Sequence, residues 1–146
     1  MTSPGKPGLD FPGVGAGLVI LRDEKLLLCR RVKAPEAEHW SIPGGKVDHM
    51  EPAHIAAKRE AEEETGLTIG QVDFLCHSEL ALASDNQHWV SLIYIARDFQ
   101  GEPTLTEPDK LSQIGWFALD QLPEPLSAFA KDALTALKHH PVHQSY

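Results

Sequence analysis

The chain has 146 residues, a length typical of one compact domain with its own hydrophobic core. A hydrophobic fraction of 42% and a charged fraction of 23% are those of a soluble globular protein, and 11 Gly and 11 Pro are too few for a fibrous or low-complexity chain. Thirteen Lys and Arg against 21 Asp and Glu give a net charge of −8, which argues against the broad cationic surface that a polymeric nucleic acid requires.

The cysteines and the apolar segments indicate in which cellular compartment the protein is expected. Cys29 and Cys76 lie far apart with no CxxC spacing, so they form neither a disulfide framework nor a thiolate zinc site. The longest apolar stretch, 14–21, is far shorter than the roughly 20 residues that span a bilayer, and the N-terminus shows no secretion signal. We therefore expect a cytoplasmic protein without a membrane partner.

The first elements in chain order are an arm and a hairpin. Residues 1–12 contain Pro and Gly without a periodic apolar pattern, and we expect them to form a flexible arm before one domain over residues 13–146. Two β-rich runs follow between residues 14 and 31, separated by Asp23 and Glu24. A short polar break between such runs predicts a hairpin.

The second half of the chain predicts more strands and a closing helix. Residues 71–83 and 89–99 are strand-like and joined by the turn-prone SDNQ, and 114–119 predicts another short strand. Apolar residues at helical spacing over 125–140 predict an amphipathic helix.

Between these halves, a helix is predicted to begin at Pro52 and to end at Gly66, because Pro is tolerated at the first helical position and Gly suits a left-handed cap. Glu60, Glu63 and Glu64 fall on one face of this helix. Like-charge pairs at this spacing cost about 0.2–0.5 kcal/mol each, so a compensating cation is expected. Because the ligands are hard oxygen donors, Mg²⁺ or Mn²⁺ is favoured over zinc.

A solvated acidic face is the simpler interpretation of these carboxylates, because most charge runs are of that kind. The residues before the helix argue against it. The Pro43-Gly44-Gly45 turn can bring backbone groups close to a ligand without interference from a Cβ atom.

This turn and helix resemble the signature of the Nudix hydrolases, G-x5-E-x7-R-E-U-x-E-E-x-G-U, where U is aliphatic. The nine fixed positions are filled by Gly45, Glu51, Arg59, Glu60, Ala61, Glu63, Glu64, Gly66 and Leu67. The resemblance implies an α+β fold, an α/β/α sandwich with a mixed central sheet. It also implies cleavage of a diphosphate linkage in a nucleotide with the help of Mg²⁺.

The resemblance further implies a set of metal ligands. Glu60 and Glu64 would be the main ligands, joined by the backbone carbonyl of Gly44. Glu63 would complete the cluster as a further ligand or as the base that orients water.

Catalytic roles beyond the metal are implied for Arg59 and Glu51, with Arg59 orienting the carboxylates and Glu51 as its partner. An ordinary surface ion pair is the alternative for Arg59. In some relatives a later acid acts as base or ligand, and Glu107 and Asp109 are the two candidates here.

Substrate contacts are expected from Gly45, Lys46, Trp40, Trp89 and Glu107. Aromatic faces accept nucleobases, and a lysine beside the glycine turn can meet a phosphate. The alternatives are core packing for either tryptophan and a solvated side chain for the lysine.

The stretches 85–103 and 107–123 resemble the MutT-like nucleoside triphosphate pyrophosphatases. This implies hydrolysis of a (d)NTP or modified purine nucleoside triphosphate to the monophosphate and pyrophosphate, a role in nucleotide pool sanitation. The alternatives are a nucleoside diphosphate sugar or dinucleotide pyrophosphatase, and a catalytically silent nucleotide-binding module. A small nucleotide is thus the expected partner; relatives commonly form homodimers, but no sequence feature settles whether this chain does.

Overall fold

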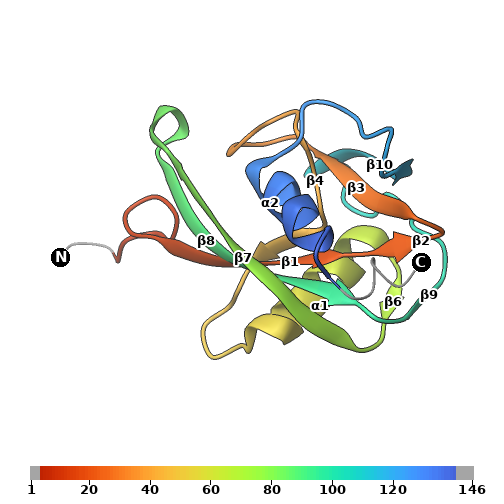
Figure 1. The fold of residues 1–146 in the computed structure, drawn as a ribbon. Helices are drawn as coiled ribbons and strands as arrows, with labels where there is room; N and C mark the ends of the chain where they lie inside the picture. The colour runs from red at the N-terminus through yellow and green to blue at the C-terminus, as the bar shows by residue number, and fades with distance from the viewer. Residues whose placement is uncertain (1–3, 141–146) are drawn as a thin grey trace.

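The computed structural model describes residues 4–140, so the ends of the expected arm and of the expected domain fall outside it (Figure 1). Within that range a four-stranded sheet has the order β5 (Gly44–Lys46), β1 (Gly13–Val19), β8 (Gln87–Ala96), β7 (Val72–Leu82). β1 pairs parallel with β8, whereas β5 and β7 pair antiparallel with their neighbours. The sheet is therefore mixed, as expected.

A second sheet in the described part of the chain has the order β10 (Leu111–Ala118), β3 (Lys25–Arg31), β2 (Leu21–Arg22). Asp23 and Glu24 connect β2 to β3 with φ angles of 52° and 61°, the positive pair that a tight hairpin turn uses. The predicted hairpin is therefore present but shorter than expected. The residues before the hairpin belong to β1, which pairs with β8 in the other sheet.

Shorter elements complete the described chain. β4 (Trp40–Ser41) pairs with β3, and β6 (Thr68–Ile69) pairs with β9 (Phe99–Gln100). A 3-10 turn, η1 (Ala83–Asp85), links β7 to β8. The strand predicted over 89–99 is therefore divided, because β8 ends at Ala96 and Phe99 belongs to β9, which pairs with β6.

The helices end close to the predicted residues. α1 (Ala53–Thr65) has Pro52 as its N-cap and ends at Gly66, whose φ of 76° is left-handed. α2 (Ala128–Leu137) begins after Ser127, whose side chain accepts a hydrogen bond from the Ala130 N–H. That capping bond places the start of α2 three residues after the predicted start at 125.

The cores lie on the two faces of the strands, with α1 on one face and α2 on the other (Figure 1). Alternate side chains of a strand point to opposite faces, so neighbouring residues serve different cores. The core beneath α1 contains Leu18, Ile20, Leu27, Ala61, Leu67 and Ile69. The core beneath α2 contains Val19, Leu26, Leu28, Ile42, Ile93, Ile95, Ala133 and Leu137. The expected α/β/α sandwich is confirmed.

The segment before β1 forms a tight turn. The Gly8 N–H donates to the Phe11 carbonyl at 2.7 Å, and the Gly8 carbonyl accepts from the His88 N–H at 2.8 Å. The flexibility expected of residues 1–12, and the domain boundary at residue 13, stay predictions.

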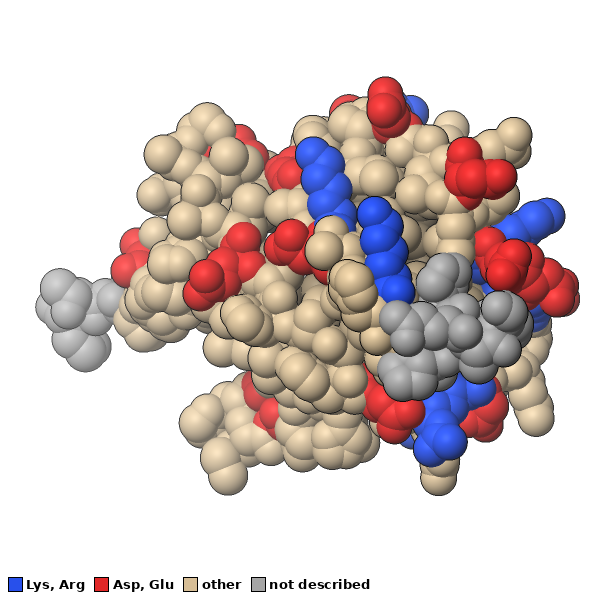
Figure 2. Space-filling model, in the orientation of Figure 1, with Lys and Arg blue, Asp and Glu red and all other residues tan. Residues whose placement is uncertain are grey.

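The surface carries charges of both signs. On the face shown in Figure 2, acidic side chains are spread among the basic ones. No helix within residues 4–140 is both long and apolar enough to cross a membrane.

Candidate active site

Arg59 connects the loop before α1 to the acidic face of the helix. Its Nε donates to Glu51 Oε2 at 2.8 Å and its Nη2 to Glu51 Oε1 at 3.0 Å, while its Nη1 donates to Glu60 Oε1 at 2.9 Å. The hydrogen bonds from Arg59, with a further one from the Asp48 N–H, lower the pKa of Glu51 to about 2. The pairing that the signature implied is present, and it ties the loop before α1 to the helix.

Glu64 is the most buried carboxylate of the stripe, with only 7% of its surface exposed. Its Oε1 accepts a hydrogen bond from the Gly44 N–H at 2.8 Å. Burial, followed by the charges of Glu60 and Glu107, raises the pKa of Glu64 to about 8. A carboxyl group in such a place is mostly protonated at neutral pH unless a cation approaches it.

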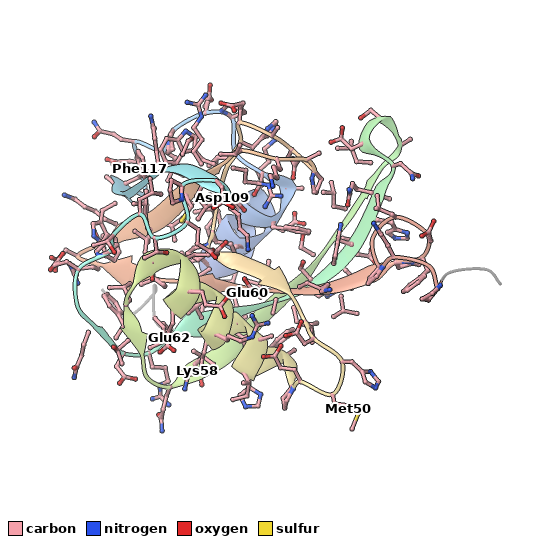
Figure 3. All side chains as sticks on the ribbon, turned by 180° about the vertical axis from the view of Figure 1, so that it is seen from behind. Met50, Lys58, Glu60, Glu62, Asp109 and Phe117 are labelled. Atoms are coloured by element: carbon pink, nitrogen blue, oxygen red, sulfur yellow. The ribbon has the colours of Figure 1, made fainter. Side chains whose placement is uncertain are left out.

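The other two carboxylates differ in exposure. The Glu60 side chain is 15% exposed, and burial raises its pKa despite the hydrogen bond from Arg59. The Glu63 side chain is 49% exposed and lies 3.4 Å from Arg59. Figure 3 shows Glu60 on the side of α1 away from Glu62 and Lys58, which face outward. The single stripe seen in the sequence thus contains two enclosed carboxylates and one that is open to water.

Glycine is required at positions 44 and 45 because neighbouring atoms lie too close for a side chain. A Cβ atom on Gly45 would lie 2.4 Å from the carboxylate carbon of Glu60, and one on Gly44 would lie 2.5 Å from the Ala16 carbonyl oxygen. Both distances are below any van der Waals contact. Two residues without side chains therefore let β5 pair with β1 and pack against the acidic face of α1.

A loop over 101–110 brings a fourth acid to the site. The Thr104 N–H donates to the Thr65 carbonyl at 2.8 Å, and the Thr106 hydroxyl donates to the Glu63 carbonyl. These bonds fasten the loop to the last turn of α1. The charge from this loop that acts on the Glu64 pKa is that of Glu107, whose carboxylate lies 3.5 Å from Lys110 Nζ.

Among residues 4–140, no three or more His, Cys, Asp or Glu side chains form a ready-made metal cluster. The donors nevertheless fit a hard divalent ion. Glu60 and Glu64 are largely removed from water and lie against the backbone of β5, and the charge of Glu60 raises the pKa of Glu64, so a cation would relieve this repulsion. Oxygen donors alone favour Mg²⁺ or Mn²⁺.

A cavity of about 360 Å³ adjoins the glycine turn. β1 forms part of its wall, where the lining residues Gly15 and Gly17 pair with Ser91 and Ile93 of β8; Gly13 pairs with Trp89 in the same ladder. A Cβ atom on Gly15 would lie 2.6 Å from Ser91 Oγ, so a larger residue would fill this space. The G-x-G-x-G spacing in a strand is the signal that could have located the cavity, because alternate residues share a face.

The expected substrate contacts divide between this cavity and the core. Gly45, Lys46 and Trp89 line the cavity. Trp40 is not part of its wall, because its ring packs edge-on against Phe117 at 4.9 Å beside the core under α2. Core packing was the alternative considered for Trp40. Glu107 lies with the carboxylates instead.

Sequence reasoning missed Arg31, a second cation of the cavity wall beside Lys46, at the end of β3. Its Nε donates to the Pro35 carbonyl at 2.8 Å. Burial lowers its pKa, and the charge of Glu64 opposes that shift. An arginine that ends an apolar strand, as in KLLLCRR, is the signal that could have singled it out.

Comparison with known proteins decides the family. The family model described as NUDIX domain matches residues 11–137. The chain belongs to the NUDIX domain family. A MutT NUDIX hydrolase from Burkholderia pseudomallei, known from its crystal structure, is similar to this Nudix chain with a TM-score of 0.83 and 45% identity over 87% of this chain and 98% of that one. The family expected from the signature is thereby confirmed, and the MutT-like branch is supported.

Two curated relatives act on different nucleotides. A CMP-5'-(N-acetyl-N-hydroxy-3-aminopropyl)phosphonate hydrolase from Streptomyces rubellomurinus is 34% identical over 77% of this chain and 55% of its own length. An oxidized purine nucleoside triphosphate hydrolase from Mus musculus is 29% identical over 73% of this chain and 66% of its own length. The Nudix chain thus spans about half of the first relative and about two thirds of the second.

Proposed function

We propose that this Nudix chain hydrolyses a diphosphate bond in a small nucleotide, with a (d)NTP or a modified purine nucleoside triphosphate as substrate. The products would be the nucleoside monophosphate and pyrophosphate. The observation that supports this most is the pair of largely buried carboxylates, Glu60 and Glu64, against the Gly44 and Gly45 backbone that also lines an open cavity. The name of the mouse relative supports the triphosphate.

In this proposal Glu60, Glu64 and the Gly44 carbonyl hold Mg²⁺. When bound, the metal supplies charge neutralisation of the diphosphate and a more acidic water. Arg59 keeps Glu60 turned toward the site through its 2.9 Å hydrogen bond, and the Gly44 N–H does the same for Glu64.

The proton of the attacking water needs an acceptor. Glu63 and Glu107 are the two candidates, because Glu63 is half exposed beside Arg59 and Glu107 reaches the cluster from its loop. Lys46 and Arg31 border the cavity and offer positive charge to the substrate phosphates.

A second candidate function is hydrolysis of a nucleotide joined to a non-nucleotide group, such as a nucleoside diphosphate sugar. The Streptomyces relative, which is named for a substrate of that general kind, supports it. The same carboxylates would serve both reactions, so the difference would lie in what fills the cavity. Cytoplasmic location and homodimerisation stay predictions, and light scattering would test the second.

The decisive experiment is a substrate panel with Mg²⁺: the dNTPs, 8-oxo-dGTP, ADP-ribose, NADH, diadenosine polyphosphates and nucleotide sugars. For the triphosphates, phosphate release is followed with and without added pyrophosphatase. For the other compounds, whose products are phosphate monoesters, it is followed with added alkaline phosphatase, and Glu64→Gln protein purified in parallel reports contaminating activity. Turnover of a triphosphate with release of pyrophosphate would support the proposal. Turnover of a sugar nucleotide or dinucleotide alone would replace it with the second function. Tight nucleotide binding without turnover would indicate a silent module.

A further inference from the structure

The turn that precedes β1 is built into the molecule. In addition to the bonds of Gly8 to Phe11 and to His88, the Asp10 N–H donates to the Lys6 carbonyl at 2.9 Å. Pro7 and Phe11 form a β-bridge across the turn. The family match begins only at residue 11, so almost all of this turn is additional to the matched domain.

The turn packs directly on Trp89. A Cβ atom on Gly8 would lie 2.3 Å from Cζ2 of Trp89, and one on Gly13 would lie 2.4 Å from Cζ3. The indole N–H donates to Gln87 Oε1 at 2.7 Å. The ring is thus held by two glycine backbones and one hydrogen bond, and its orientation is set by the turn as well as by β8.

The same turn forms a wall of the cavity. Pro7 and Leu9 line it together with Trp89, and Leu9 is 41% exposed. The Gly44–Lys46 end of the cavity lies opposite Gly15 to Gly17 of β1, whereas Trp89 lies opposite Gly13. Four residues of strand separate Gly13 from Gly17, which is about 13 Å. One cavity therefore has a polar end beside the carboxylates and an apolar, aromatic end beside the turn.

We propose that residues 7–9 of the turn are part of the substrate site, where Pro7 and Leu9, with the Trp89 ring that the turn positions, contact the base of the nucleotide and set base preference. This rests on the proposed function for the reaction at the other end of the cavity. An apolar wall beside an aromatic face suits a planar base and offers nothing to a phosphate. The wall is apolar and carries few hydrogen-bonding groups, so it selects by shape and stacking.

The test compares Leu9→Ala with Phe11→Ala. Phe11 lies on the same turn and is 50% exposed, but it faces a different hollow and does not line this cavity. For the best substrate of the panel, Leu9→Ala should raise KM at least fivefold with kcat within twofold, and should narrow the spread of kcat/KM among the four bases. Leu9→Met, which restores apolar volume, should recover KM. Phe11→Ala should leave both constants within twofold.

Calorimetric titration with AMP, GMP, CMP and UMP supplies a measurement that needs no turnover. Leu9→Ala should weaken the tightest of the four at least threefold. If the wild-type protein hydrolyses nothing but shows this loss, the inference stands and the proposed function fails. If the wild type is active and Leu9→Ala changes neither KM nor base preference, the inference is overturned and the function stands. Equal effects of Leu9→Ala and Phe11→Ala, or no binding of any monophosphate by the wild type, would also overturn the inference.

Discussion

Glu64 shows how folding changes the chemistry of one side chain. In the sequence it is one of three glutamates on a helix face, but in the structure it is enclosed, bonded to the Gly44 N–H and close to two other acids. The free energy of an ionised carboxylate in such a place is high until a cation binds. Under the proposed function, this makes Glu64 a residue whose burial destabilises the metal-free fold and serves metal binding.

The raised pKa of Glu64 predicts a pH-dependent stability of the metal-free protein. Between pH 4.5 and about 8 the folded state retains a proton that the unfolded state has lost, so the free energy of unfolding falls as pH rises. Glu64→Gln keeps the shape and the acceptor for Gly44 but has no such proton. In EDTA, the melting temperature of Glu64→Gln minus that of the wild type should therefore be larger at pH 8 than at pH 5. An equal difference at both pH values would contradict the raised pKa.

The same substitution should lower turnover. Glu64→Gln removes a charged ligand, so turnover at saturating Mg²⁺ should fall at least about tenfold. Glu62→Gln is the matched control, because Glu62 lies on the same helix, is exposed and accepts a hydrogen bond from the Ile69 N–H. Near-normal kcat in the Glu64 variant, measured by pyrophosphate release, would reject the assignment of the site.

α1 carries the site, but two loops complete it. The loop before the helix is fastened by Arg59 to Glu51, and the loop over 101–110 is fastened by Thr104 and Thr106 to the last turn. Side chains on one helix can hold only one side of a ligand. The arrangement therefore depends on how firmly these loops are held to α1.

Arg59→Lys tests the first of these loops. Lysine keeps the charge but cannot reproduce the two-pronged bond to Glu51, so kcat should fall about tenfold and amide exchange in residues 47–52 should accelerate. Arg97→Lys is the control, since Arg97 makes an exposed pair with Asp73 at 3.6 Å. If kcat and the amide exchange rates are unchanged in Arg59→Lys, the contact between Arg59 and Glu51 is an ordinary ion pair without a role in positioning the loop.

Variants in the loop over 101–110 distinguish Glu107 from Asp109 as the later acid of the site. The charge of Glu107, and not that of Asp109, acts on Glu64, which favours Glu107 as the late acid. Glu107→Gln should therefore lower kcat about tenfold, whereas Asp109→Asn should leave it within about twofold. Steady-state kinetics of the two isosteric variants measure this. The reverse result would assign the role to Asp109, and two unaffected rates would mean that neither residue serves.

The whole molecule is held by strands that serve both helices. Leu27 and Leu28 are neighbours on β3 and fully buried, yet Leu27 packs in the core under α1 and Leu28 in the core under α2. Because the same strands separate the two cores, loss of either core removes support from the other. This geometry predicts a single cooperative unfolding transition.

Leu27→Ala and Leu28→Ala should each lower the free energy of unfolding by about 2–5 kcal/mol. Each variant should still unfold in one step, with circular dichroism and tryptophan fluorescence giving the same urea midpoint. Leu105→Ala, at an exposed leucine, should change stability by less than about 0.5 kcal/mol. Separate midpoints for the two probes would show that α1 and α2 unfold independently.

The spacing of residues within single elements was enough to predict much of this protein. The 3.6-residue period places Glu60 and Glu64 on one face of α1, Gly66 ends that helix, and Asp23 and Glu24 form the hairpin turn. These are local properties, because they depend on bonds and side chains within a few residues. The Nudix signature is of the same kind, since its positions lie within one loop and one helix.

Only the tertiary structure decided the burial, the pKa and the neighbours of each of these residues. It enclosed Glu64 and left Glu63 open, brought Glu107 to the cluster, and placed Trp40 in the core and Trp89 on the cavity wall. Burial, pKa and access depend on which distant segments pack against a side chain, and no local period records them. The turn before β1 makes the same point, because its role comes entirely from its contact with β8, about eighty residues later in the chain.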